Sequence, residues 1–323
     1  MKIVKSMFVA MLIAVPTLSA TAAEVIFAGE KNGQFDLFIA DLSTSQIKQL
    51  TETSANEVMP TVSPDRGRVA FISNRSGAES LYLMPIDNAS GTTDISAGMG
   101  AYGYPAFSPG GGKILARYAP DPQEPMIDTQ IVILDPHTRH QEIVIDSGKL
   151  KTSENSDSVV VVDRPVWVSE ALIAYVLAEY SDLESGRISK STIYMFDLKK
   201  REQVRVAGGE SYFNEEGSPM GFKATMPVVF AAGELDRTLI FTAIRGHVDR
   251  EPMKFSLSGS DKGIVELGDA EFFGPLFPAG DGWVYGVIND EGTTGLAWRA
   301  KDLKEPRRVL PFVGRIITPA IVR

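Results

Sequence analysis

The side chains most often used for metal binding and acid–base catalysis are scarce in this 323-residue chain. It contains no cysteine and three histidines, His137, His140 and His247. Without cysteine there is no disulfide, no thiolate ligand and no cysteine nucleophile. His137 and His140 fall in the turn-like stretch PHTRH, and two imidazoles without converging carboxylates do not complete a zinc or manganese site. The sequence therefore predicts no metal site and no cofactor.

Serines and carboxylates give weaker patterns. No G-x-S-x-G elbow occurs, and Ser45 with Lys48 is a single match to S-x-x-K, a pattern short enough to arise by chance. Asp121, Glu124 and Asp128 carry the oxygen ligands that Ca²⁺ prefers, but a solvated loop is the simpler interpretation. A carboxylate pair for glycoside hydrolysis stays open, because distances between remote segments are invisible in a sequence. No residue is assigned a catalytic role.

Composition narrows the classes of protein and of partner. The chain is 44% apolar, which excludes a disordered polypeptide. It has 41 acidic and 32 basic residues, a formal charge of −9, so nucleic acid and anionic membrane surfaces are not expected as partners.

The first 23 residues have the pattern of a bacterial secretory signal. Lys2 and Lys5 precede a short apolar run at residues 7–15, and Ala20 and Ala22 form an A-x-A cleavage site. An N-terminal anchor is the alternative, but small residues follow the run at once. No later apolar run approaches the ~18 residues that a membrane helix needs. We expect a periplasmic or secreted protein, cleaved after Ala22 or Ala23, with no membrane insertion after signal removal.

A repeat organises the rest of the chain. A proline followed by a small or branched residue and then an apolar residue recurs at intervals of 44 to 62 residues, at Pro60, Pro105, Pro165, Pro227, Pro275 and Pro319. Each proline is followed by short runs rich in Val, Ile, Phe and Tyr, separated by Gly and Asp turns. Units of this length with four short strands each are typical of propeller blades.

The two ends of the chain complement each other. Residues 24–51 contain the last three strands of a unit without the proline strand, and residues 318–323 contain a proline strand with nothing after it. Joining them completes a sixth unit and leaves no free sheet edge. The expected fold is therefore all-β, a six-bladed β-propeller over residues 24–323 whose C-terminal strand closes the N-terminal blade. A two-sheet sandwich does not explain the complementary ends, and an outer-membrane barrel needs longer strands.

Three segments carry a family resemblance. Residues 59–87 (MPTVSPDRGRVAFISNRSGAESLYLMPID) resemble the WD40-like repeat of TolB-type propellers, residues 104–118 are a looser match, and residues 29–42 resemble the later half of such a repeat. The resemblance implies a six-bladed periplasmic propeller related to the Tol–Pal envelope system. TolB has an α/β domain before its propeller, whereas this chain is expected to run from signal to propeller, so the Tol–Pal role is not carried over. The repeat also occurs in peptidase-linked propellers and in polysaccharide lyases, so it specifies the fold better than the function.

One face of the propeller is expected to bind a ligand. The longer connections, at residues 119–128, 146–159, 179–190, 208–223 and 246–251, share the face on which the chain enters each innermost strand, and length inserted on one face usually marks a binding face. The residues just ahead of the prolines would surround the channel mouth there. They are Glu57, Tyr102, Tyr104, Asp163, Arg164, Lys223, Phe272, Phe273 and Arg315.

This mixture of aromatic and charged side chains suits a peptide or a sugar. The alternative is that the aromatics pack between blades and that Arg164 pairs with Asp163 or Glu57. The favoured hypothesis is a non-catalytic module that binds a protein or peptide of the cell envelope. The alternative is a carbohydrate-active hydrolase or lyase working at the channel mouth, although lyases of this fold use a histidine-rich metal centre and no histidine precedes any of the six prolines.

Overall fold

A computed structural model describes residues 24–150, 158–182, 184, 187–208, 223–231, 237–245, 249–256, 262–264, 273–279, 282–288, 294–300, 308–312 and 314–321. These residues form six four-stranded antiparallel sheets and two short 3₁₀ turns, η1 (Ala89–Gly91) and η2 (Ser147–Leu150). Within this part of the chain no helix is long and apolar enough to cross a membrane.

Five of the sheets each use four consecutive strands. They are β4 (Glu57–Val62), β5 (Arg68–Ser73), β6 (Ser80–Pro85) and β7 (Thr93–Asp94); β8 (Ala101–Phe107), β9 (Ile114–Ala119), β10 (Gln130–Leu134) and β11 (Gln141–Asp146); β12 (Val159–Ser169), β13 (Leu172–Asp182), β14 (Arg187–Asp197) and β15 (Glu202–Gly208); β16 (Lys223–Ala231), β17 (Arg237–Arg245), β18 (Asp249–Ser256) and β19 (Lys262–Ile264); and β20 (Phe273–Ala279), β21 (Gly282–Ile288), β22 (Thr294–Ala300) and β23 (Arg308–Val309). The remaining sheet is split: β24 (Ile316–Ile321) lies beside β1 (Glu24–Lys31), followed by β2 (Gln34–Asp41) and β3 (Ile47–Gln49).

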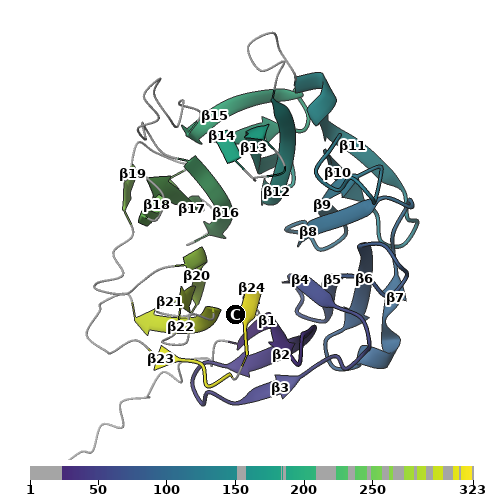
Figure 1. The fold of residues 1–323 in the computed structure, drawn as a ribbon, viewed down its shortest axis with the longest axis vertical. Coiled ribbons are helices and arrows are strands. Elements are labelled where there is room, and N and C mark those ends of the chain that lie inside the picture. The colour runs from purple at the N-terminus through teal and green to yellow at the C-terminus, as the bar shows by residue number, and fades with distance from the viewer. Residues whose placement is uncertain are drawn as a thin grey trace, which may run out of the picture.

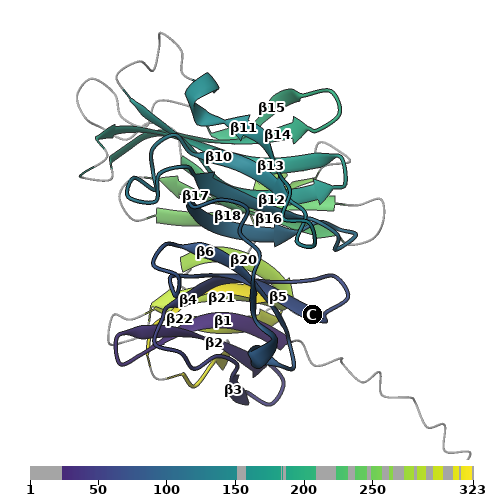
Figure 2. The same ribbon diagram turned by 90° about the vertical axis from the view of Figure 1, so that its right-hand side faces the viewer.

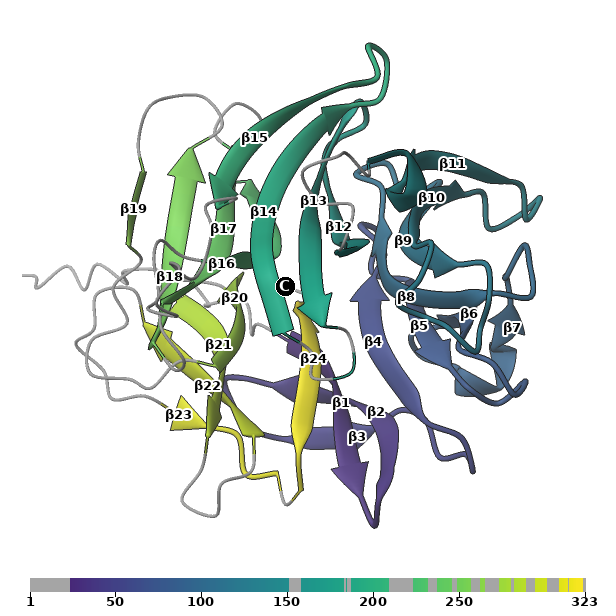
Figure 3. The same cartoon turned by 45° about the horizontal axis from the view of Figure 1, so that its top comes forward.

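The sheets stand around a common axis (Figure 1), and the predicted all-β propeller is confirmed. Six blades were predicted. Five blades are each built from one continuous stretch of chain, and the sixth sheet is complete only when the C-terminal strand β24 joins β1, β2 and β3. The innermost strands, next to the axis, are β24, β4, β8, β12, β16 and β20. Figure 2 shows the ring from the side, and the tilted view shows the curved strands β14 and β15 reaching beyond the other sheets (Figure 3).

The C-terminal strand closes the ring as predicted. Strand β24 pairs with β1 through Val25–Ile321, Ile26–Ala320, Ala28–Ile317 and Gly29–Ile316. The Glu30 amide donates a further hydrogen bond of 2.7 Å to the Arg315 carbonyl. Strands from opposite ends of the sequence therefore share one sheet.

The hydrophobic core lies between neighbouring sheets rather than inside any one of them. Six clusters of buried side chains occur, and each joins residues of two adjacent sheets. One example packs Phe27 and Phe38 of the split sheet against Val284 and Leu296 of the β20–β23 sheet. Among the described side chains, the buried residues of a sheet therefore pack against its two neighbours.

Each innermost strand contains a β-bulge at its repeat proline. The register shifts at that point in all six strands. In five of them two residues face one on the partner strand, and in β20 the two residues Gly274 and Pro275 fall between the pairs Phe273–Gly286 and Leu276–Tyr285 with no residue opposite them. The bulge residues are Met59-Pro60, Tyr104-Pro105, Arg164-Pro165, Met226-Pro227, Gly274-Pro275 and Thr318-Pro319. The prolines lie inside the innermost strands rather than at their first residues, because the bulge leaves the proline nitrogen without a ladder partner.

Candidate functional site

The bulges set the direction of the side chains that precede the prolines. Met59, Tyr104 and Arg164 have positive φ angles of 53°, 50° and 47°, the left-handed region that non-glycine residues seldom adopt. A bulge with this backbone turns a side chain out of the alternation of the strand. The three residues lie on β4, β8 and β12, which are consecutive innermost strands. The Tyr104 amide faces Met59 Sδ at 3.3 Å, so the three positions are neighbours around the axis.

Two of these residues, Tyr104 and Arg164, form what we call the Tyr104 cluster together with Asp163 on β12 and Arg117 on β9. The Arg164 guanidinium lies 4.4 Å from the centroid of the Tyr104 ring, and the Arg117 guanidinium lies 5.6 Å from it. Asp163 is shared, because Oδ1 is 3.5 Å from Arg117 Nη1 and Oδ2 is 3.5 Å from Arg164 Nε. Two guanidinium groups and one carboxylate leave the cluster with a positive charge in an acidic protein.

Arg117 is the buried support of the cluster. It is 6% exposed and pairs with Gly103 across β8 and β9. A Cβ at Gly103 would lie 3.1 Å from Arg117 Nη2, so glycine gives the guanidinium its room. Met126, in the connection at residues 119–128, lies with its Sδ 3.4 Å from Arg117 Nη1. Arg117 has no local signal in the sequence, because it lies twelve residues beyond Pro105 and comes into place only through strand pairing.

The tyrosines of this region stay protonated at neutral pH. Burial raises the pKa of the Tyr104 hydroxyl, the nearby Asp163 carboxylate raises it further, and the two arginines act in the opposite direction. Burial also raises the pKa of Tyr180, on β13, with Asp163 as the next cause. Each phenol is therefore a neutral hydrogen-bond donor beside the guanidinium groups.

Two of the predicted channel-mouth residues belong to the interior instead. Tyr102 is fully buried, and its hydroxyl donates to Gln141 Oε1 at 2.6 Å while it accepts from the amides of Ala97 and Gly98. Burial raises the pKa of Tyr102 to about 12. Glu57 is also fully buried. A ligand cannot reach either side chain, because the regular part of each strand turns it into the packing between sheets.

The other predicted positions lie apart from the Tyr104 cluster. Arg315, just before β24, is exposed, lies 3.2 Å from Glu30 and stacks over the Phe35 ring at 5.1 Å. Lys223 and Phe273 are the first residues of β16 and β20. Phe272 lies outside the described residues. The structure thus brings together Tyr104, Asp163 and Arg164 from the predicted set.

The residues considered for metal binding and nucleophilic catalysis lie in exposed turns. The turn between the third and fourth strands is the same in three sheets, where Asp41, Asp135 and Asp197 each accept two backbone amides two and three residues on. Ser45 and the pair His137 and His140 lie in these turns, whereas His247 lies outside the described part. Within the described residues no group of three or more His, Cys, Asp or Glu side chains is placed to hold a metal ion.

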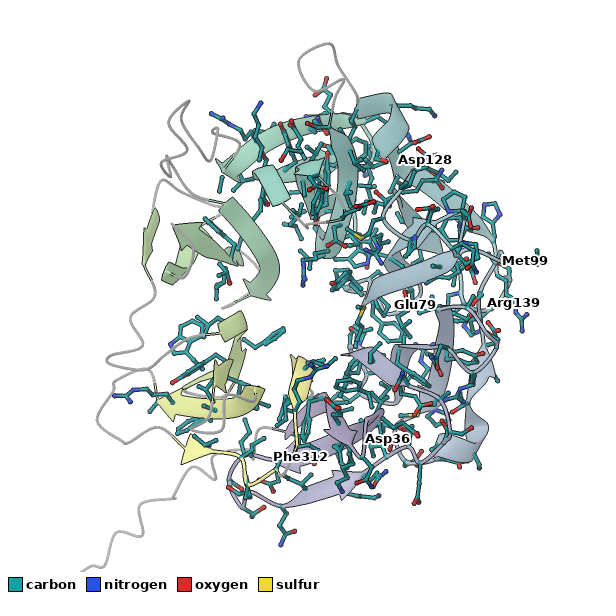
Figure 4. The ribbon with its side chains drawn as sticks, in the orientation of Figure 1. Asp36, Glu79, Met99, Asp128, Arg139 and Phe312 are labelled. Atoms are coloured by element: carbon teal, nitrogen blue, oxygen red, sulfur yellow. The ribbon has the colours of Figure 1, made fainter. Side chains whose placement is uncertain are left out.

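A carboxylate pair that was not predicted from the sequence lies between the first two sheets. Asp36 on β2 and Glu57 on β4 are hydrogen-bonded to each other. Glu57 Oε1 also accepts from Thr53 Oγ1 at 2.6 Å and from Arg75 Nη2 at 2.9 Å. Burial, and then the bond to Glu57, raises the pKa of Asp36 to about 6. Asp36 is labelled in Figure 4. Twenty residues separate the pair, and no motif connects them.

We expect Asp36→Asn to make folding more stable at neutral pH and not at acidic pH. An aspartate whose pKa is raised on folding contributes stability that is fully present below its unfolded value near 3.8 and is lost as the pH rises through about 6. Asparagine keeps a donor toward Glu57 and has no charge to bury. The variant should be about 1–2 kcal/mol more stable than the wild type at pH 7.5 and about equal at pH 4, measured by urea unfolding at several pH values.

Asp135→Asn is the matched control with the opposite sign. Hydrogen bonds from the Thr138 and His137 amides lower the pKa of Asp135, so its contribution is present at neutral pH and disappears as the pH falls. This variant should be less stable than the wild type at pH 7.5. An Asp36→Asn difference that does not change between pH 4 and pH 7.5 would contradict the assignment of the proton to Asp36.

The six-sheet ring and its closing strand define the class of the protein, a β-propeller. A family model described as TolB beta propeller domain matches residues 2–160. The predicted resemblance of its repeats to TolB-type propellers is confirmed. A search of the curated proteins finds no match.

Solved structures give the same fold at low sequence identity. TolB from Acinetobacter baumannii is 15% identical with a TM-score of 0.66, and the match covers 93% of this chain and 66% of that chain. A chain of the nidogen/laminin complex is 10% identical with a TM-score of 0.62, covering 93% and 98%. An oligogalacturonate lyase in complex with manganese is 13% identical with a TM-score of 0.53, covering 88% and 73%. Likeness at this level of identity concerns the fold alone, and this chain spans 66% of that TolB chain.

Proposed function

We propose that this TolB-like propeller is a non-catalytic binding module of the bacterial cell envelope, periplasmic or secreted, and that it binds a protein or peptide at the Tyr104 cluster. The observation that carries the proposal is the pair of arginines, Arg117 on β9 and Arg164 on β12, whose guanidinium groups lie over the ring of Tyr104 on β8. Tyrosine and arginine are the residue types that most often dominate protein-binding sites. Asp163, the carboxylate of the cluster, lies between two guanidinium groups that hold it as an ion-pair partner.

Partner capture from an envelope extract tests this function. The wild type should retain one or more envelope proteins, and the double variant Tyr104→Ala with Arg164→Ala should lose them. The control is Arg139→Ala with His140→Ala, since these exposed residues lie in an outer turn and Figure 4 labels Arg139 at the rim. Identical partner profiles for wild type and double variant would remove the proposed site. Glycan cleavage by the purified wild type would favour the hydrolase or lyase alternative.

The expected secretory signal gives a second prediction, which concerns export and processing of the chain. Expression in a Gram-negative host should give a periplasmic product whose N-terminus, read by mass spectrometry, is Ala23 or Glu24. Strand β1 begins at Glu24, so cleavage at either bond leaves the first sheet whole. Replacing Ala20 and Ala22 by lysine should block processing, because signal peptidase requires small residues at these positions. A mature product that starts at Met1 would contradict the secretory assignment.

A further inference from the structure

Arg164 combines an anchored side chain with an open hydrogen-bonding edge. Its Nε faces Asp163 Oδ2, and its guanidinium plane lies over the Tyr104 ring. Its two terminal amino groups make no hydrogen bond or ion pair with any residue that the structure describes. The side chain is 28% exposed, so this edge is open to a ligand. A planar guanidinium with both Nη groups free matches the two oxygens of a carboxylate.

The charge of the cluster is not balanced from within. Asp163 is divided between two arginines, and both contacts, at 3.5 Å, are longer than the 2.7–2.9 Å of a strong charge-assisted hydrogen bond. Arg117 is buried and forms an ion pair with one of the two oxygens of this carboxylate. Glu79 acts on Tyr104 from a distance, but its side chain is exposed to water, which screens it. An anionic ligand group would therefore complete the site.

The surroundings of Arg164 favour a peptide as the source of that group. Tyr104 fixes the guanidinium by stacking and adds a phenolic donor, which reduces the ordering that binding requires. Met59, the neighbouring pre-proline residue, contributes a flexible apolar side chain next to Tyr104. Methionine adapts to varied apolar side chains at peptide-binding surfaces, whereas a sugar would need further hydrogen-bonding groups there. A carboxylate side chain beside an apolar one matches this pair of positions.

We propose that Arg164, held on Tyr104, binds the carboxylate of a glutamate or aspartate that has an apolar neighbour in a bound peptide segment. This inference rests on the proposed function and specifies the chemistry of the partner segment. It assigns Arg164 the direct contact, Tyr104 the support of the guanidinium and Met59 the adjacent apolar contact.

A pair of fluorescein-labelled peptides tests the inference: Gly-Leu-Glu-Gly-Leu-Glu-Gly and the same peptide with glutamine in place of both glutamates. Fluorescence anisotropy with the full mature chain should show the glutamate peptide binding about 10-fold more tightly than the glutamine peptide, the ratio expected for one charge-assisted hydrogen-bonded pair. Arg164→Gln should remove this preference. Arg164→Lys, which keeps the charge and loses the fork and the stacking, should leave only part of it.

Arg139→Gln is the control, because it removes the same charge at the outer rim and should leave the preference unchanged. The melting temperature of each variant checks that it is folded. Equal affinity for both peptides, no binding of the glutamate peptide to the wild type, or an unchanged preference in Arg164→Gln would overturn the inference. So would binding of trigalacturonate that depends on Arg164 in the absence of any peptide binding, since it would assign the carboxylate to a sugar.

Failure of this inference is distinguishable from failure of the proposed function. If the wild type captures an envelope protein that the Tyr104 and Arg164 double variant loses, the function stands even when the two peptides bind alike. If nothing is captured and the glutamate peptide does not bind, both proposals fail.

Discussion

A chain that ends at Arg315 is expected to lose cooperative folding. Removing residues 316–323 deletes β24 and leaves the inner edge of β1 without its four backbone partners. The strand also joins two interblade cores, because Ile316 packs in the cluster with Phe27 and Phe38, and Ile317 packs against the cluster between the first and second sheets. Truncating a single buried isoleucine costs about 2–5 kcal/mol, and a whole domain has about 5–15 kcal/mol of stability. The stability lost with the strand is therefore comparable to the stability of the whole domain.

Thermal unfolding followed by circular dichroism measures this effect. The truncated chain should show no sharp transition where the full chain melts, and a synthetic peptide of residues 316–323 should restore it by adding a strand to the open edge. A chain that ends at Ile321, the last residue of β24, is the control and should melt like the full chain. A cooperative melt within a few degrees of the wild type after loss of β24 would show that ring closure is not what stabilises the fold.

Trp167→Ala is expected to cost about 3–5 kcal/mol, the usual loss for a buried tryptophan, and to disrupt binding as well. Trp167 is 7% exposed and belongs to the cluster that joins the β8–β11 and β12–β15 sheets. Its Nε1 donates to the Ala106 carbonyl at 3.1 Å, so it connects β12 directly to β8. Trp167 lies three positions after Arg164, and Ala106 lies two positions after Tyr104. Their contact therefore fixes the separation of the two stacked side chains.

Trp167→Phe separates packing from the hydrogen bond. It keeps most of the apolar contact and loses the donor, and should cost about 1 kcal/mol. Urea unfolding gives the stability of both variants, and partner capture under conditions in which each is folded gives the effect on the site. A folded Trp167→Ala protein that captures partners like the wild type would show that the Tyr104 cluster keeps its geometry without this contact. A loss of stability below 1 kcal/mol would contradict the burial argument.

The periodic features of the fold could be predicted from the sequence. The six prolines, the four-strand rhythm and the complementary ends determine the propeller and its closure, because each repeat needs its neighbours to bury its strands. The aspartate turns were also predictable, since an aspartate that accepts nearby amides is a local interaction. The position of the prolines inside the strands was not predictable, because a bulge depends on the pairing of two strands.

The composition of the site was only partly predictable for the same reason. Tyr104 and Arg164 were found by their place before a proline, which is a local signal. Arg117 joins them through pairing with Gly103, and Asp36 meets Glu57 across two sheets, so neither contact has a sequence signature. Tyr102 and Glu57 were wrongly predicted to lie at the channel mouth. Successive side chains of a strand point to opposite faces, so an error of one residue in the expected register reverses the direction of a side chain.

The backbone of the proline bulges has a consequence for how such a protein diversifies. Before Pro60, Pro105 and Pro165 the main chain takes the left-handed conformation, and the bulge sets the direction of the side chain. Asparagine, aspartate and glycine would adopt this conformation most easily. A combinatorial library at residues 59, 104 and 164 would therefore vary recognition on a constant scaffold, and new binding preferences should arise by exchanging single residues at these positions.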